Sequence, residues 1–181
     1  MTGMRVLDVV KDETGRHAVV LVDDRTHRVL VIFISVSGAQ VIASEVRGER
    51  PAKPMTHELT VDLVEAAEVG VNEVPAESLK EQESIFYGAI FVKSEPTQRK
   101  VDVGPSDSIA IALRTSSPIY ATDEVMDRAA IRPVKKDLEG KGKLHSIKDL
   151  SGTIEAAVKA GVFPQEELGA LQNSKSLLYE D

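Results

Sequence analysis

The sequence predicts an α+β domain with a mixed β-sheet of about seven strands and four helices, plus a C-terminal helical appendage. The order of the elements carries this prediction, because three apolar strands come first, two helical stretches follow, and a hairpin comes after them. A doubly wound fold would instead alternate strands and helices regularly. The length of 181 residues and the 42% content of hydrophobic residues suffice for one core domain and a short extension.

Segments rich in Val, Ile and Leu and bounded by turn residues predict the strands. These segments are residues 4–10, 16–22, 27–34, 71–79, 84–94, 101–103 and 119–121. Turn residues such as Asp23 and Asp24 separate the first three, which we therefore expect to form a meander. Segment 84–94 is mostly apolar and is expected to be central, whereas Pro75 places the strand before it at an edge or at a bulge.

Apolar residues at helical spacing predict core helices at residues 35–47, 56–69, 105–115 and 123–130. The polar residues that can cap these helices are Ser35 or Ser37, Thr56, and Thr122 or Asp123. Pro105 suits the first turn of the third helix, where its missing N–H needs no partner. Gly38 is costly inside the first helix unless another part of the chain closely approaches its backbone.

Composition changes at the end of the predicted core. We predict a core domain at residues 4–133 and a separate segment at residues 134–181. Residues 135–143 are charged and contain glycine, as a flexible link would, and we expect them to bury little. Two short helices at residues 151–160 and 165–171 would then form a hairpin, packed on the core or on a second subunit.

The chain carries a net charge of -7 and has a pI of about 5.2, so it has no general electrostatic attraction to nucleic acid. Binding to DNA or RNA would need a local basic patch, and the best one is the loop at residues 47–54, with Arg47, Arg50 and Lys53. This loop is either a solvated connection or a segment that contacts phosphate. Aromatic residues make up only 4% of the chain, which leaves few platforms on which single-stranded bases could stack.

The chain has no cysteine, which excludes disulfides, thiolate zinc sites and a cysteine nucleophile, and which fits a reducing compartment. We find no signal peptide, and no apolar run approaches the ~20 residues that cross a bilayer. We therefore expect a soluble, cytoplasmic protein with no membrane partner.

Two polar motifs stand at predicted helix starts. The first is Pro54-Met55-Thr56-His57-Glu58-Leu59, and the second runs from Gly104-Pro105-Ser106-Asp107 through its helix to Ser117-Pro118-Ile119-Tyr120. Asp107 falls in the first turn, where backbone N–H groups favour a carboxylate, so it is either a helix-start residue or part of a site. Glu58, Asp62 and Glu65 form an acidic stripe that is either a solvated face or part of a metal site.

Together the two motifs resemble the bifunctional nuclease family. Members of that family carry an Arg-Pro-x-Thr-His-Asp-Leu segment and, later, an Arg-Pro-Ser-Asp-Ala helix start followed by a Pro-Ile strand. The resemblance covers residues 4–133 and implies the family's fold and an activity on both DNA and RNA. The positions that depart from the family pattern are Gly38, where it has Glu, Lys53 and Gly104, where it has Arg, and Glu58, where it has Asp.

The resemblance and the chemistry of phosphodiester hydrolysis together assign the candidate catalytic residues. His57 would be the general base or a metal ligand, and Glu58 and Asp107 would hold Mg²⁺ or Mn²⁺. The residues expected to bind phosphate are Lys53, Arg114 and Ser106. Asp107 and Arg114 are about 10.5 Å apart along a helix axis, a spacing that suits a phosphate between them better than a direct ion pair.

Two functions remain open for this sequence. The first is phosphodiester hydrolysis of DNA or RNA, weakened by the charged residues that the chain lacks. The alternative is a non-catalytic binding or assembly protein that keeps the family fold. In both cases we expect a homo-oligomer.

Overall fold

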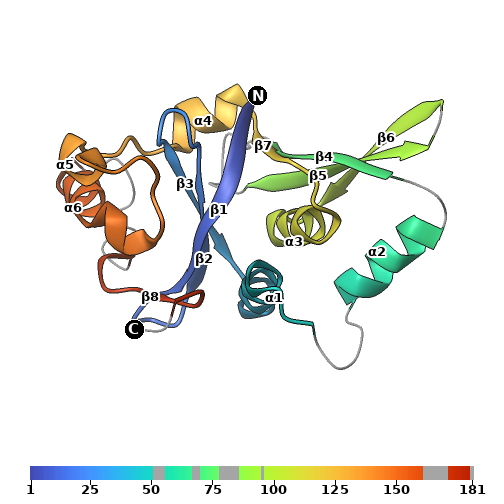
Figure 1. Ribbon diagram of the computed structural model, residues 1–181, viewed down its shortest axis with the longest axis horizontal. Coiled ribbons are helices and arrows are strands. Elements are labelled where there is room, and N and C mark those ends of the chain that lie inside the picture. Colours follow the sequence, from blue (N-terminus) through green and yellow to red (C-terminus); the bar gives the residue numbers. More distant parts are fainter. Residues whose placement is uncertain (51–55, 67–69, 78–85, 95, 161–170, 180–181) are drawn as a thin grey trace.

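The computed structural model describes residues 1–50, 56–66, 70–77, 86–94, 96–160 and 171–179 (Figure 1). The strands are β1 (Thr2–Lys11), β2 (His17–Val22), β3 (Val29–Ile34), β4 (Gly70–Glu77), β5 (Tyr87–Ser94), β6 (Thr97–Val103), β7 (Ile119–Ala121) and β8 (Lys175–Ser176). The helices are α1 (Val36–Arg47), α2 (Thr56–Ala66), α3 (Pro105–Thr115), α4 (Asp123–Ala129), α5 (Lys135–Leu138), the 3-10 helix η1 (Ile147–Leu150) and α6 (Ser151–Ala160). The predicted α+β class is confirmed.

The predicted core helices are confirmed as α1, α2, α3 and α4, except that residues 67–69 of the second one lie outside the described part of the chain. The segment that follows residue 133 adds α5, η1 and α6. Side-chain caps explain where two of these helices begin. The Ser35 side chain caps α1 by accepting a hydrogen bond from the N–H of Gly38, and the Thr122 side chain caps α4 in the same way. Among the described residues, no helix combines the length and the apolar character needed to span a membrane.

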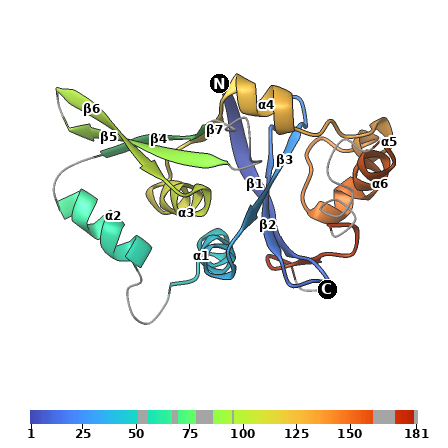
Figure 2. The same cartoon turned by 180° about the vertical axis from the view of Figure 1, so that it is seen from behind.

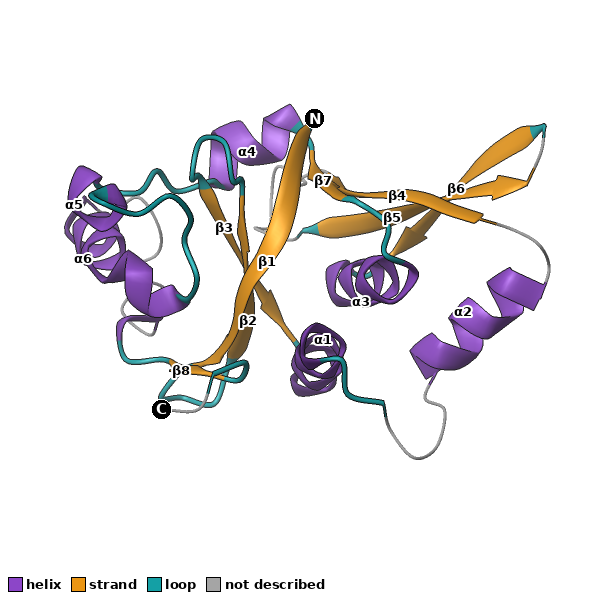
Figure 3. Cartoon of the chain, in the orientation of Figure 1, coloured by secondary structure: helices purple, strands orange, loops and turns teal. Residues whose placement is uncertain are grey.

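Strand β1 joins the two halves of one mixed sheet (Figure 3), whose order is β3-β2-β1-β7-β4-β5-β6. On one side, β1, β2 and β3 form the predicted antiparallel meander. On the other side, β7 pairs antiparallel with β1 and parallel with β4. Strand β4 lies inside the sheet, so the edge position predicted from Pro75 is wrong. The register of β4 against β5 shifts between Val71 and Glu73, before Pro75 is reached.

The meander buries side chains on both faces, because successive residues of a strand point to opposite sides. In β2, Val19 and Leu21 belong to an apolar cluster with residues of α1, α3 and α4. Val20 and Val22 point to the other face and belong to a second cluster, which Leu144 and other residues after 134 complete. Figure 2 shows the same arrangement from behind, with α1 and α3 on one side of the meander and α5 and α6 on the other.

The segment after residue 134 buries more than its composition suggests. Leu144 is 0% exposed and Leu150 is 1% exposed. Asp8, which is fully buried in β1, accepts hydrogen bonds from the N–H of Ile147 at 3.1 Å and from the Ser176 hydroxyl at 2.6 Å. Burial raises the pKa of Asp8, although these hydrogen bonds act in the opposite direction.

The charged link at residues 135–143 is itself mostly exposed, as expected, and the segment that follows it covers the second apolar face of the meander. Within the link, buried Asp137 accepts hydrogen bonds from the N–H and the hydroxyl of Thr153, at 2.7 and 2.6 Å. The division near residue 133 stays a prediction. Of the second predicted tail helix, residues 165–170 lie outside the described part of the chain.

Candidate active site

Three helices bring the two sequence motifs together. Helix α2 begins at Thr56 and carries His57 and Glu58 in its first turn. Helix α3 begins after Gly104, with Pro105 in its first turn, and carries Asp107 there too. The first motif residues Pro54 and Met55 lie outside the described residues, as does Lys53.

His57 and Asp107 are joined by a hydrogen bond of 2.8 Å between Nε2 and Oδ1, although they are 50 residues apart in the sequence. Their side chains are 22% and 50% exposed, so solvent and a substrate can reach both. A carboxylate only accepts hydrogen bonds, so Nε2 of the neutral ring carries the proton. The tautomer assigned in this way leaves Nδ1 as the ring nitrogen that can accept a proton.

Arg114 links all three helices behind this pair. From the last turn of α3 its guanidinium contacts Oε1 of Glu45 in α1, at 3.2 Å, and Oε1 of Glu58 in α2. The Arg114 side chain is 12% exposed and both carboxylates are 13% exposed. Removing one member of a buried ion pair typically costs about 3–5 kcal/mol, so this contact fixes the place of α2. The phosphate contact predicted for Arg114 stays a prediction, which this pairing disfavours.

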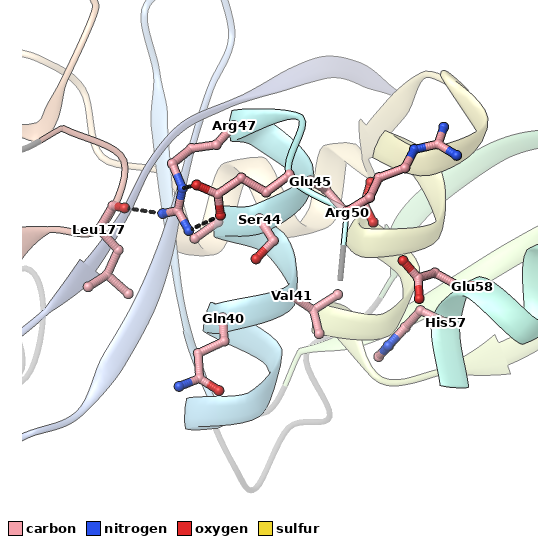
Figure 4. Close-up of a pocket in the computed structure, with 11 residues that line it drawn as sticks. Gln40, Val41, Ser44, Glu45, Arg47, Arg50, His57, Glu58 and Leu177 are labelled. Carbon is pink, nitrogen blue, oxygen red and sulfur yellow. Dashed lines mark hydrogen bonds and ion pairs between the residues drawn. The ribbon is translucent and has the colours of Figure 1, made fainter. Parts of the chain in front are cut away.

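A pocket of about 510 Å³ lies between α1 and α2. Figure 4 shows His57 and Glu58 on α2 at one side, and Gln40, Val41 and Ser44 along α1. The pocket therefore offers the His57 ring, apolar and polar groups of α1, and charged groups from the loop that follows α1. Its size is that of a site for a small molecule or a short stretch of a polymer.

The cations of the predicted basic loop differ in their surroundings. Arg47 is held by Glu49, through two hydrogen bonds of 2.7 Å, and donates to the carbonyl of Leu177 at 2.5 Å (Figure 4). Arg50 also lines the pocket, and no ion pair holds it within the described part of the chain. Arg50 is therefore the cation of this loop that is best placed to meet an anion in the pocket.

Comparison with known proteins decides the family. The bifunctional nuclease domain matches residues 19–134 of the chain. This chain belongs to the bifunctional nuclease domain family. Two relatives from two strains of Mycobacterium tuberculosis are each 35% identical over 132 residues, which cover 72% of this chain and 77% of the relative. Both are named as uncharacterized proteins, so they add support for the family and none for an activity.

Gly38, one departure from the bifunctional nuclease pattern, has a packing reason. A Cβ built on Gly38 would lie 2.7 Å from Cβ of Ser106, which real structures essentially never show. The starts of α1 and α3 can therefore meet only because position 38 lacks a side chain. This close approach also places Ser106 beside two helix N-termini, whose N–H groups and dipoles favour an anion, in keeping with the phosphate contact predicted for Ser106.

Gly104, a second departure, leaves room for the Asp107 carboxylate. A Cβ built on Gly104 would lie 3.0 Å from Oδ2 of Asp107. The carboxylate thus folds back over the backbone that precedes its own helix. An arginine at position 104 would add a cation to the candidate site, but its side chain would also press on the Asp107 carboxylate, which accepts a hydrogen bond from His57.

The Mg²⁺ or Mn²⁺ site stays a prediction that the described residues do not fit. Among them there is no group of three or more His, Cys, Asp or Glu side chains that could hold a metal ion. The two assigned ligands also have other partners, since Asp107 accepts from His57 and Glu58 contacts Arg114. We therefore derive no catalytic step through a metal ion.

The sequence motifs identified His57, Glu58 and Asp107, and the structure brings these residues to one place. Sequence reasoning missed Glu45, which lines the pocket and pairs with Arg114. Helical periodicity places Glu45 on α1 but gives no sign of a partner 69 positions away on another helix. Arg50 was part of the predicted basic loop but not of the predicted site.

Proposed function

We propose that this protein hydrolyses phosphodiester bonds of DNA or RNA, slowly, with His57 as the general base. The observation that supports the proposal is the 2.8 Å hydrogen bond between His57 and Asp107 beside the pocket. A histidine base oriented by a carboxylate is a recurrent arrangement for activating a nucleophile. Here it combines residues from both family motifs.

The proposed step begins when Nδ1 of His57 takes a proton from an attacking water molecule. The oxygen of that water forms a bond to phosphorus, and the bond between phosphorus and the leaving oxygen breaks. The leaving oxygen takes up a proton from solvent water, and the protonated His57 ring then releases its proton to solvent, which balances the reaction. Asp107 keeps the ring oriented and stabilises its positive charge, and Arg50 would offset the charge that develops on the phosphate oxygens.

The surroundings of the pocket argue for a slow reaction. Glu45, Glu49 and Glu58 line it together with Arg47 and Arg50, and Arg114 pairs with Glu45 and Glu58, so the charges around the pocket balance. A phosphate group approaching this pocket lacks the attraction that a cationic site would supply. Loss of one charge-stabilising donor typically lowers a rate by about a hundred- to a thousandfold.

A second candidate function is non-catalytic binding or assembly, and the Arg114 contacts favour it. Because two carboxylates pair with the Arg114 guanidinium, this group is not available to bind phosphate. It contributes instead to the packing of α1, α2 and α3. In this case the family fold would persist while the pocket binds a ligand without cleaving it.

Incubation with labelled single-stranded DNA and RNA tests the proposal. Cleavage is measured with Mg²⁺, with Mn²⁺ and with a chelator, while fluorescence anisotropy measures binding in parallel. We expect slow cleavage that persists with the chelator. Binding without cleavage under all three conditions would support the second candidate, and cleavage that requires the ions would restore the predicted metal role. A cytoplasmic location stays a prediction.

A further inference from the structure

The two ends of the sheet differ in how they are covered. At one end, β3 pairs with Ile131, whose N–H and C=O exchange hydrogen bonds of 2.7 and 2.8 Å with Val29. At the other end, β6 is the last strand of the sheet order among the described residues, and it extends away from the helices (Figure 1, Figure 3). Residues 97–102 of β6 are all exposed. A long exposed edge of this kind offers its backbone groups to another strand.

The charged side chains of β6 can form ion pairs with those of a second β6 from another copy of the chain. Lys100 and Asp102 lie on one face of the strand and form an ion pair of 3.4 Å, with side chains 42% and 82% exposed. Val101, between them, is 45% exposed on the other face. Opposite residues of two antiparallel strands point to the same face, so in a two-fold pair their numbers must add to an even number. An axis through Val101 meets this condition and places Lys100 opposite Asp102 of the second copy, twice.

We propose that β6 is a self-association edge, on which a second copy of this chain adds its own β6 antiparallel. The two sheets then form one continuous sheet, with a Val101 pair at the centre and two Lys–Asp pairs beside it. Opposite charges placed directly across a strand pair are favourable and like charges are not. A one-strand interface is small, so we expect dissociation in the micromolar range or weaker.

Charged residues at a sheet edge can also serve the opposite purpose, which is to prevent pairing. The two roles predict different outcomes. If the charges only block association, the wild-type chain stays a monomer and removing Lys100 promotes aggregation. If they select a second copy, reversing one charge weakens a dimer that the wild type forms.

Analytical ultracentrifugation of the full chain, from micromolar to several hundred micromolar, decides between these roles. The wild type should show a reversible monomer–dimer equilibrium. Lys100→Glu makes positions 100 and 102 both negative and Asp102→Lys makes them both positive, so each variant alone should dissociate on the order of tenfold more readily. A mixture of the two variants should dimerise again, because every cross-strand pair is then complementary. A rescue that appears only on mixing cannot come from changes within one chain.

The matched control is Lys175→Glu, the same charge change at an exposed residue of β8, which should leave the dimer unchanged. Thermal unfolding of each variant checks that the fold is intact. The inference is overturned if the wild type is monomeric over the whole range, if Lys100→Glu and Asp102→Lys dimerise like the wild type, or if mixing them restores nothing.

Discussion

At the scale of single residues, Asp107 orients the His57 ring through one hydrogen bond. The hydrogen bond to Oδ1 fixes which ring nitrogen carries the proton and which one can accept a proton. Asp107→Asn removes the negative charge that stabilises a protonated ring, so we expect the cleavage rate to fall on the order of a hundredfold. Asp123→Asn, at the exposed start of α4, serves as the matched control. Equal cleavage rates for Asp107→Asn and wild type would show that Asp107 has no role in the reaction.

Asp12 provides a test, at a single residue, of how the stability of the fold depends on pH. Its carboxylate is 1% exposed and accepts hydrogen bonds from Thr14 and Arg16. Burial alone would raise the pKa of Asp12, but these hydrogen bonds outweigh burial and lower the pKa from the usual 3.8 to about 2. Because the pKa is lower in the folded state, Asp12 stabilises the fold above pH 3.8, and this stabilisation is lost as the pH falls to about 2.

Asp12→Asn should therefore lower the free energy of unfolding on the order of 1–2 kcal/mol at neutral pH, and by much less near pH 2. Urea unfolding at the two pH values measures the difference. The exposed neighbour Glu13, changed to Gln, should have little effect at either pH. An equal loss at both pH values for Asp12→Asn would show that the charge of Asp12 is not the stabilising feature.

At the scale of elements, the contact between α1 and α3 depends on Gly38. An alanine there raises helix propensity by about 1 kcal/mol, but its Cβ meets Cβ of Ser106 at 2.7 Å. Neither atom can move without its helix, so overpacking should prevail and lower the free energy of unfolding by about 1–3 kcal/mol. Gly142→Ala is the control, since a Cβ at that position meets nothing within 4 Å. Thermal unfolding compares the two.

The pair Gly38 and Ser106 also permits a rescue. In the double variant Gly38→Ala with Ser106→Gly, the opposing Cβ is gone, and most of the loss caused by Gly38→Ala should be recovered. If the double variant is no more stable than the sum of the single effects, the two positions are not in contact and the packing reason for Gly38 fails.

Most elements could be predicted from apolar periodicity, and the exceptions have a common cause. Strand β6 spans Thr97–Val103, although only residues 101–103 were expected to be extended. Its first residues are polar and exposed on both faces, so they give no alternating pattern to detect. The site shows the same limit, because motifs supply His57 and Asp107 while the contact of Arg114 with Glu45 depends on how three helices meet.

At the scale of the whole molecule, the tail completes the fold. The chain after residue 134 supplies Leu144, Ile147 and Leu150 to the cluster that covers the second face of the meander. The sequence held a signal of this need, since residues 18–22 are a continuous apolar run and a strand of that kind is buried on both faces. The composition of the segment after residue 134 did not indicate this burial, because composition averages over a segment while packing depends on individual side chains.

Removing the tail should therefore damage the core. Truncation after Pro133 leaves the apolar face of β1, β2 and β3 exposed, so we expect a chain that aggregates or unfolds without cooperativity. Thermal unfolding with a dye that binds apolar surface measures both effects. The single substitution Leu144→Ala should lower the free energy of unfolding by about 2–5 kcal/mol and keep a cooperative transition. A truncated chain that unfolds cooperatively would instead support an independent domain at residues 4–133.

The central claim is that His57 carries a slow phosphodiester hydrolysis, and one comparison of rates tests it most directly. His57→Gln and His145→Gln are purified identically with the wild type, and single-turnover cleavage of labelled single-stranded RNA and DNA is measured for all three. His145 is exposed and lies in the segment after residue 134, so its substitution controls for the loss of a histidine and for contaminating nucleases. We expect slow cleavage by wild type and His145→Gln, and a rate lower on the order of a hundredfold or more for His57→Gln. Cleavage by His57→Gln at the wild-type rate, or no cleavage by any of the three, would contradict the claim.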